Sequence, residues 1–138
     1  MPFLYIESGQ RYPMKSGKFS ISARLRSFKY ASKGFWWMIR DEHNSWIYVG
    51  VTVILIPVCF LLTLSRLEWA LITLCIGLVY VMEMINSAIE RLADKISPGH
   101  DPVIGQIKDL AAGAVLMTAI TAAIVALLIL VPKFLAFL

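Results

Sequence analysis

The chain has 138 residues and a formal net charge of +4, and 59% of its residues are hydrophobic while 16% are charged. Soluble domains carry roughly 45–50% apolar and about 25% charged residues, so this chain has more apolar side chains than one small core can bury. The composition excludes a disordered chain and a collagen-like repeat, and it indicates a membrane protein. The two cysteines, Cys59 and Cys75, lie in apolar stretches, and we interpret them as small hydrophobic residues.

The first 45 residues are much more basic than the rest of the chain. They contain eight of the thirteen Lys and Arg residues. The positive-inside rule therefore predicts that the amino terminus is cytoplasmic. Residues 1–18 show no hydrophobic periodicity, and we interpret them as a tail without an assigned function. A secretory signal is not expected, because no short apolar segment with a cleavage site follows the amino terminus.

Apolar and basic side chains are interleaved at helical spacing in residues 19–40. The set comprises the apolar Ile21, Leu25, Phe28, Phe35, Trp36, Trp37 and Ile39 and the basic Arg24, Lys29, Lys33 and Arg40. This pattern predicts an amphipathic helix that lies in the membrane interface, with its basic side toward anionic headgroups.

Three transmembrane helices are predicted at about residues 46–64, 69–90 and 110–131; the apolar run of the second ends at Met82, and the helix continues through polar residues. Each holds about the 20 residues that a helix needs to span a hydrocarbon core of ~30 Å. Residues 65–68 are predicted to form a turn at the outer surface, and residues 91–109 a cytoplasmic loop. The expected fold is an all-α integral membrane protein with three transmembrane helices and an N-terminal amphipathic surface helix, in one domain of residues 19–138.

Turn-forming residues separate the second and third predicted helices. Ser97-Pro98-Gly99 is expected to end the second helix, and Asp101 followed by Pro102 predicts the N-cap and first residue of the third. The polar ends of both helices are therefore expected at the same membrane surface.

Polar residues continue along one face of the second predicted membrane helix. Glu83, Asn86, Glu90 and Asp94 fall within an arc of about 80° at ~100° per residue. A solvated helix end explains Asp94 equally well. Glu83 lies about 10 Å deeper than Glu90, at or below the headgroup plane. An ionisable side chain at that depth is a functional candidate by default.

More polar residues lie at the same predicted membrane boundary. Asp41 and Glu42 precede the first membrane helix, and Lys108 and Asp109 begin the third. Singly, they can be interpreted as anchors of helix ends at the interface. Together with Glu83 and its neighbours they supply carboxylates, an amide and a lysine, which a magnesium–phosphate site requires. The phosphate-binding loops of soluble proteins and the H-E-x-x-H motif are missing from the sequence.

The run E-M-I-N-S-A-I-E from Glu83 to Glu90, followed by Asp94 and Lys108-Asp109, resembles the signature of the bacterial integral-membrane diacylglycerol kinase and undecaprenol kinase family. The resemblance implies a lipid kinase of the bacterial cytoplasmic (inner) membrane. Its protomers would form a homotrimer with shared active sites. The implied reaction is phosphorylation of a lipid alcohol, undecaprenol or diacylglycerol, with ATP and Mg²⁺. No nucleic-acid partner is expected.

The resemblance also implies roles for individual residues. Glu83 corresponds to the general base that takes the proton from the lipid hydroxyl. Glu42 and Glu90 correspond to ligands of the Mg²⁺ that accompanies ATP, with Asn86 and Asp94 supporting them. Contacts with the nucleotide are expected from Tyr30, Glu42, Glu90, Gly99, His100, Asp101, Lys108 and Asp109, among which Lys108 would meet the phosphates.

Two regions depart from the family pattern. Relatives commonly have basic or imidazole side chains just after the position of Asn44, where this chain has the sequence S-W-I-Y, and Arg24 and Arg26 compete for the arginine expected in the surface helix. The 97–100 loop and the A-A-G-A-V sequence of the third helix are more similar to the undecaprenol kinase branch. They favour undecaprenol over diacylglycerol as the substrate.

Two other functions are compatible with the sequence. A non-catalytic membrane subunit, or an ion- or partner-binding protein, would use the same acidic residues to bind a cation or a basic partner. The substitution Glu83→Gln would then abolish that binding without affecting ATP-dependent labelling of a lipid. A lipid phosphatase ranks last, because it would need more arginines or a histidine nucleophile than residues 91–109 supply.

Overall fold

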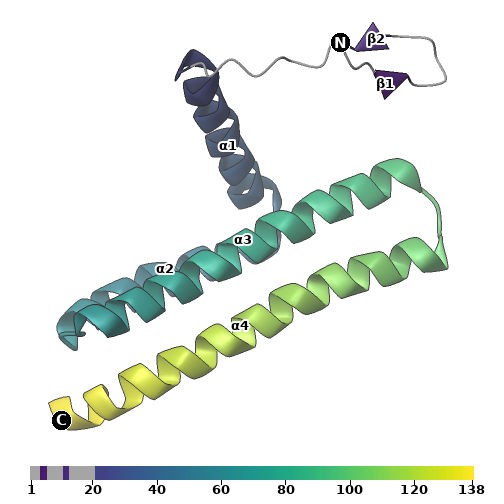
Figure 1. Cartoon of the computed structure of the whole chain (residues 1–138). Coiled ribbons are helices and arrows are strands. Elements are labelled where there is room, and N and C mark those ends of the chain that lie inside the picture. Colours follow the sequence, from purple (N-terminus) through teal and green to yellow (C-terminus); the bar gives the residue numbers. More distant parts are fainter. Residues whose placement is uncertain (1–3, 6–10, 13–20) are drawn as a thin grey trace. The chain divides into compact units, whose positions relative to one another are not determined.

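The computed structural model describes residues 4–5, 11–12 and 21–138 (Figure 1). The elements are β1 (Leu4–Tyr5), β2 (Arg11–Tyr12), α1 (Ile21–Asp41), α2 (His43–Leu61), α3 (Arg66–Ile96) and α4 (Pro102–Phe137). Apart from the two short strands, which pair antiparallel, the described fold is all-α. The helices α2, α3 and α4 are each long and apolar enough to cross a membrane. The predicted fold class is therefore confirmed.

The predicted tail falls mostly outside the described residues, which omit residues 1–3, 6–10 and 13–18 of it. Residues 19 and 20 of the predicted surface helix are outside them as well. The division into a tail of residues 1–18 and a membrane domain of residues 19–138 stays a prediction.

The chain divides into two compact units after Ser32. In the first unit, the apolar side chains of Ile21, Leu25 and Phe28 are between 66% and 72% exposed. They recur at i, i+4 and i+7 and so share one face of α1. This uncovered apolar face fits the predicted helix in the membrane interface.

In the second unit, α3 is the central helix. The helices α3 and α4 form a long antiparallel hairpin, and α2 lies beside the first half of α3 (Figure 1). In the most apolar 18-residue window of α3, 28% of the window is buried inside the structure, compared with 11% for α2 and 6% for α4. Few of the described apolar residues are buried: Met38, Cys59, Leu62, Ile72, Val79, Ala93 and Val115.

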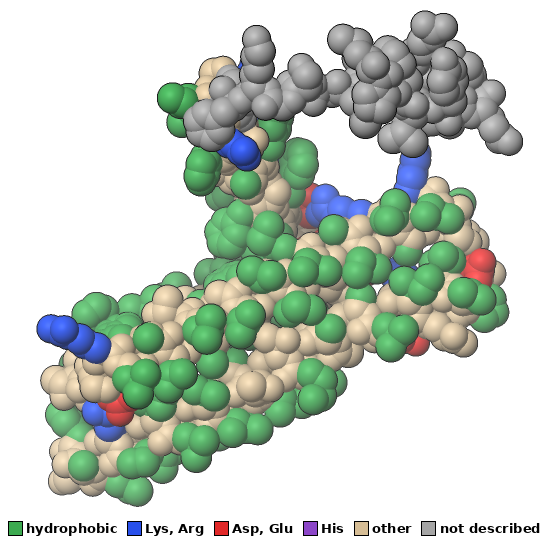
Figure 2. Space-filling model, in the orientation of Figure 1, with side chains coloured by type: hydrophobic (Ala, Val, Ile, Leu, Met, Phe, Trp, Pro, Cys, Tyr) green, Lys and Arg blue, Asp and Glu red, His purple; other side chains and the backbone are tan. Residues whose placement is uncertain are grey.

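Most apolar side chains of the hairpin therefore face outward. Figure 2 shows hydrophobic side chains over the visible face of α3 and α4, with charged side chains gathered toward the helix ends. In water such a surface would be unfavourable, because burying apolar surface lowers the free energy by about 25 cal/mol per Å². Lipid tails cover it without that cost, which fits a membrane protein.

The turn between α2 and α3 lies earlier in the chain than the sequence indicated. The helix α2 ends at Leu61, and α3 begins at Arg66, so residues 66–68 are its first turn and not a turn of the link. The cause is a capping box: the backbone N–H of Ser65 donates to Glu68 Oε2 over 2.6 Å, and the N–H of Glu68 donates to Ser65 Oγ over 3.4 Å.

The same end of the bundle is joined to α4 by Lys133. Its Nζ lies 3.2 Å from Glu68 Oε2 and donates to the carbonyl oxygen of Thr63 over 3.4 Å. Thr63 has a φ of 46°, which is uncommon for a β-branched residue, so these contacts hold a tight link in place.

The link between α3 and α4 follows the sequence signals. Asp101 Oδ1 accepts hydrogen bonds from the backbone N–H groups of Val103, over 2.8 Å, and Ile104, over 3.3 Å. Pro102 occupies the first position of α4, where its missing N–H has no cost. The short link brings the last turns of α3 beside the first turns of α4.

Candidate active site

Among the polar residues predicted to share one face of α3, the most buried lie in the middle of the helix. Glu83 is 2% exposed and Asn86 is 7% exposed. Asn86 Nδ2 donates to Glu90 Oε1 over 3.0 Å, so the amide orients the carboxylate one turn further along. The other amide atom, Asn86 Oδ1, is buried without a hydrogen-bond partner in the described part of the chain.

A third carboxylate comes from the junction of α1 and α2. Glu42 is the N-cap of α2 and has an extended backbone, with φ −102° and ψ 116°, so the helical path is interrupted there. The carboxyl groups of Glu42 and Glu90 lie close enough to Glu83 to act on it electrostatically. We call Glu42, Glu83 and Glu90 the acidic cluster. Residues about 40 positions apart in the chain thus come close to one another where α2 begins beside the middle of α3.

Two basic side chains neighbour the acidic cluster. One guanidinium nitrogen of Arg91 lies 3.3 Å from Asp41 Oδ2 and 3.4 Å from Glu42 Oε1, which ties α3 to the junction of α1 and α2. Lys108 Nζ lies 2.9 Å from Asp94 Oδ1, which ties the first turns of α4 to the last turns of α3. The ammonium group of Lys108 also interacts electrostatically with Glu90.

The remaining predicted site residues are placed less centrally. Asp101 is used as the N-cap of α4. The carbonyl oxygen of Gly99 accepts a hydrogen bond from Ser97 Oγ over 3.4 Å. His100 and Asp109 are exposed, and Tyr30, which is 67% exposed, belongs to the first unit.

Sequence reasoning missed three polar residues around the acidic cluster. Ser45 is 0% exposed and Ser87 is 6% exposed, and neither hydroxyl has a hydrogen-bond partner among the residues that the structure describes. Arg91 is the third, because it is not among the predicted site residues. Ser87 could have been found from its spacing, since it lies four residues after Glu83 and shares its face. The contact of Arg91 with Glu42 has no signal in the sequence.

The acidic cluster has the donor chemistry of a Mg²⁺ site that is completed by a ligand. Within residues 21–138 and the two strands, no group of three or more His, Cys, Asp or Glu side chains is arranged to hold a metal ion alone. Two carboxylates, Glu42 and Glu90, are what Mg²⁺ commonly takes from a protein when phosphates supply further oxygens. The unpartnered Asn86 Oδ1 beside them is another available oxygen. The residues therefore fit a metal–phosphate complex.

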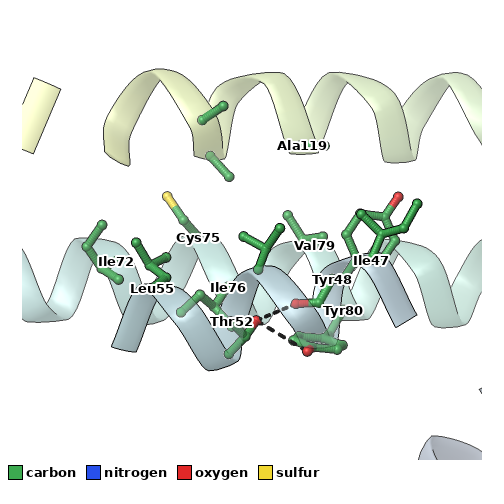
Figure 3. A pocket seen from close by; sticks show the side chains of 13 residues that line it. Ile47, Tyr48, Thr52, Leu55, Ile72, Cys75, Ile76, Val79, Tyr80 and Ala119 are labelled. Atoms are coloured by element: carbon green, nitrogen blue, oxygen red, sulfur yellow. Dashed lines mark hydrogen bonds between the residues drawn. The ribbon is translucent and has the colours of Figure 1, made fainter. Parts of the chain in front are cut away.

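An apolar cavity of about 260 Å³ lies between α2, α3 and α4 (Figure 3), and its lining includes Val79, one helical turn before Glu83. Tyr48, Thr52 and Tyr80 form its polar end: Thr52 Oγ1 donates to the Tyr48 carbonyl oxygen over 2.7 Å, and the Tyr80 hydroxyl donates to Thr52 Oγ1 over 3.3 Å. Ile72 lies at the opposite end (Figure 3). Tyr48 is near enough to Glu83 for the two to interact electrostatically. The cavity thus leads from the apolar interior toward the buried carboxylate.

Comparison with known proteins gives consistent matches. The family described as "Prokaryotic diacylglycerol kinase" matches residues 29–130, a range that includes the acidic cluster. The chain is 38% identical over 109 residues to an undecaprenol kinase of Bacillus subtilis, which covers 79% of this chain and 89% of that protein. It is 31% identical over 129 residues to a diacylglycerol kinase of Synechocystis, covering 92% and 74%. It is 36% identical over 107 residues to a diacylglycerol kinase of Pseudomonas aeruginosa, covering 76% and 87%.

Proposed function

This chain belongs to the prokaryotic diacylglycerol kinase family and is a lipid kinase, and we propose that it transfers the γ-phosphate of MgATP to the hydroxyl of a membrane lipid alcohol at the cytoplasmic membrane surface. The observation that carries the proposal is the buried carboxylate of Glu83, which lies beside Glu42, Glu90 and an apolar cavity. A lipid hydroxyl and a metal–phosphate complex can meet at such a place, one from the bilayer and one from the aqueous side.

Glu83 is proposed as the general base. Its carboxylate accepts the proton of the lipid hydroxyl while the hydroxyl oxygen bonds to the γ-phosphorus and the bond to the bridging oxygen of ADP breaks. A positioned base contributes typically 10²- to 10⁴-fold to a rate. Phosphoryl transfer asks the protein chiefly to align the two oxygens and to stabilise charge, so no covalent intermediate is needed.

The other residues of the cluster are proposed to hold the nucleotide. Glu42 and Glu90 would hold Mg²⁺, and Asn86 keeps Glu90 in place through its 3.0 Å hydrogen bond. When bound, the ion would offset the negative charge of the phosphates. Lys108 would meet the phosphates, with Asp94 as its partner in their absence. Further nucleotide contacts are proposed for Tyr30, Gly99, His100, Asp101 and Asp109.

Undecaprenol is the substrate that we favour over diacylglycerol. The relative named undecaprenol kinase, at 38% identity, supports this choice together with the sequence of the 97–100 loop. The cavity beside Glu83 would hold the part of the chain nearest the hydroxyl. We further propose a homotrimer with shared active sites, in the bacterial inner membrane with a cytoplasmic amino terminus.

The test of this function is transfer of label from γ-labelled ATP by purified protein in bilayers. We expect Mg²⁺-dependent label in undecaprenol, less in diacylglycerol, and little in inorganic phosphate when no lipid alcohol is present. Label in neither lipid, with folded protein, would remove the proposed kinase activity. A non-catalytic subunit would give that result, whereas a phosphatase would release phosphate from a lipid phosphate.

Filling the cavity should weaken binding of the lipid and leave binding of the nucleotide intact. Ala122 lies on its wall, and Ala122→Phe puts a ring into space that the lipid chain would occupy. We expect the KM for undecaprenol to rise by about tenfold, since misfits in apolar pockets typically cost 10- to 200-fold. The KM for MgATP should change less than about twofold. The matched control is Leu127→Phe, on an exposed position of α4. An unchanged lipid KM in Ala122→Phe would remove the cavity from the proposal.

A further inference from the structure

We propose that Arg91 is an internal counter-ion of Glu42, and that it is displaced onto Asp41 when a divalent cation binds to Glu42. The proposal rests on the proposed function, because it takes Glu42 as a metal ligand. Arg91 is then a positioning residue: it touches no substrate but sets how readily one ligand of the metal becomes available.

The geometry gives Arg91 two alternative partners. The same guanidinium nitrogen lies 3.3 Å from Asp41 Oδ2 and 3.4 Å from Glu42 Oε1. Neither contact has the short, two-bonded geometry of a strong arginine–carboxylate pair. The side chain of Asp41 is 40% exposed and that of Glu42 is 24% exposed, so the contact with Asp41 is the more solvated one. Because both contacts use this nitrogen, Asp41 is an acceptor already in contact with Arg91 when another cation takes Glu42.

The charges around the site explain why a counter-ion is needed. Glu83 is buried and feels both Glu42 and Glu90, so three carboxyl groups gather where water is scarce. Among the described residues, Arg91 is the cation that pairs with a member of the acidic cluster, since Lys108 pairs with Asp94. Its charge lowers the mutual repulsion of the cluster in the absence of a metal.

A divalent cation between Glu42 and Glu90 changes this balance. It carries twice the charge of the guanidinium and binds carboxylate oxygens directly, so it outcompetes Arg91 for Glu42. Asp41 then holds Arg91 at the junction of α1 and α2 instead of letting it oppose the incoming ion. The two substitutions therefore have opposite expected effects: removing Arg91 favours metal binding, and removing Asp41 disfavours it.

The experiment measures binding of the Mn²⁺ complex of a non-hydrolysable ATP analogue by EPR, with the full chain in detergent or bilayers. We expect Arg91→Gln to tighten binding about three- to tenfold and Asp41→Asn to weaken it by a similar factor. In the Arg91→Gln variant, Asp41→Asn should change the logarithm of the affinity by less than half as much as it does in the parent protein. Lys95→Gln is the matched control, because it removes one positive charge from the same helix end, and it should change binding less than twofold.

Each result decides the matter. Weaker binding in Arg91→Gln, or an effect no larger than that of Lys95→Gln, would overturn the proposal. Full additivity of Arg91→Gln and Asp41→Asn would do so too, because it would mean that the two residues do not act through one another. Glu42→Gln separates this failure from that of the proposed function: if it leaves Mn²⁺ binding unchanged, Glu42 is not a metal ligand. If Arg91→Gln does not fold, Asp41→Asn still tests the direction.

Discussion

Replacing Glu83 with Gln should lower kcat by about 10²- to 10⁴-fold while the protein folds and binds MgATP as before. The amide has nearly the same shape as the carboxyl group but cannot accept the proton of the lipid hydroxyl. Thermal unfolding should show equal or higher stability, because the substitution removes a buried charge that Glu42 and Glu90 oppose. The measurement combines labelled-ATP turnover, binding of an ATP analogue and the melting temperature.

Glu68→Gln is the matched control for this experiment. Glu68 lies on the same helix as Glu83 but in its first turn, where it completes the capping box with Ser65 and pairs with Lys133 at 3.2 Å. Its loss should lower the melting temperature and leave kcat within about twofold of the parent. Glu83→Gln should thus lower kcat without lowering stability, whereas Glu68→Gln should lower stability without lowering kcat. Parental turnover in Glu83→Gln would contradict the role of proton acceptor.

Replacing Glu90 with Gln should raise the Mg²⁺ concentration for half-maximal activity by about 10- to 100-fold. The substitution removes one of two proposed carboxylate ligands and also changes the group that Asn86 orients at 3.0 Å. Part of the lost kcat should return at high Mg²⁺, because the remaining oxygens can still bind the ion. The measurement is a Mg²⁺ titration of lipid phosphorylation at saturating ATP.

Glu42→Gln is expected to give the same pattern, because Glu42 is the other proposed ligand. Glu68→Gln again serves as the control and should leave the Mg²⁺ titration unchanged. A variant Glu90→Gln that loses kcat without any shift along the Mg²⁺ axis would argue for another role of this carboxylate. The combination distinguishes a metal ligand from a residue that only shapes the site.

The sequence predicted the helices well because in a membrane protein the apolar runs themselves determine where the spans lie. It also predicted the Asp101-Pro102 start of α4, since both signals act within one turn. The predicted start of α3 lies too late, because hydropathy carries no information on the Ser65–Glu68 capping box. Capping residues define the ends of these helices better than hydropathy does.

The candidate site was predictable where its residues lie on one helix. The spacing of Glu83, Asn86 and Glu90 places them on one face, and the structure buries the first two there. The spacing of residues along one helix does not show how that helix is oriented relative to another. The approach of Arg91 to Glu42, 49 residues away, depends on the direction of the chain at the junction of α1 and α2. The burial of Ser45 arises from the same junction.

The length of α3 has a consequence for the setting of Glu83 in the membrane. A helix of 31 residues measures about 46 Å, whereas a hydrocarbon core measures about 30 Å. Glu83 lies 18 residues, or about 27 Å, beyond the Ser65 cap at the other end. The depth of this carboxylate in the membrane is therefore expected to depend on bilayer thickness. With long acyl chains it would lie within the hydrocarbon core, and with short ones it would lie among the headgroups. We therefore expect the acyl composition of the host membrane to change the polarity around the carboxylate that is proposed as the general base.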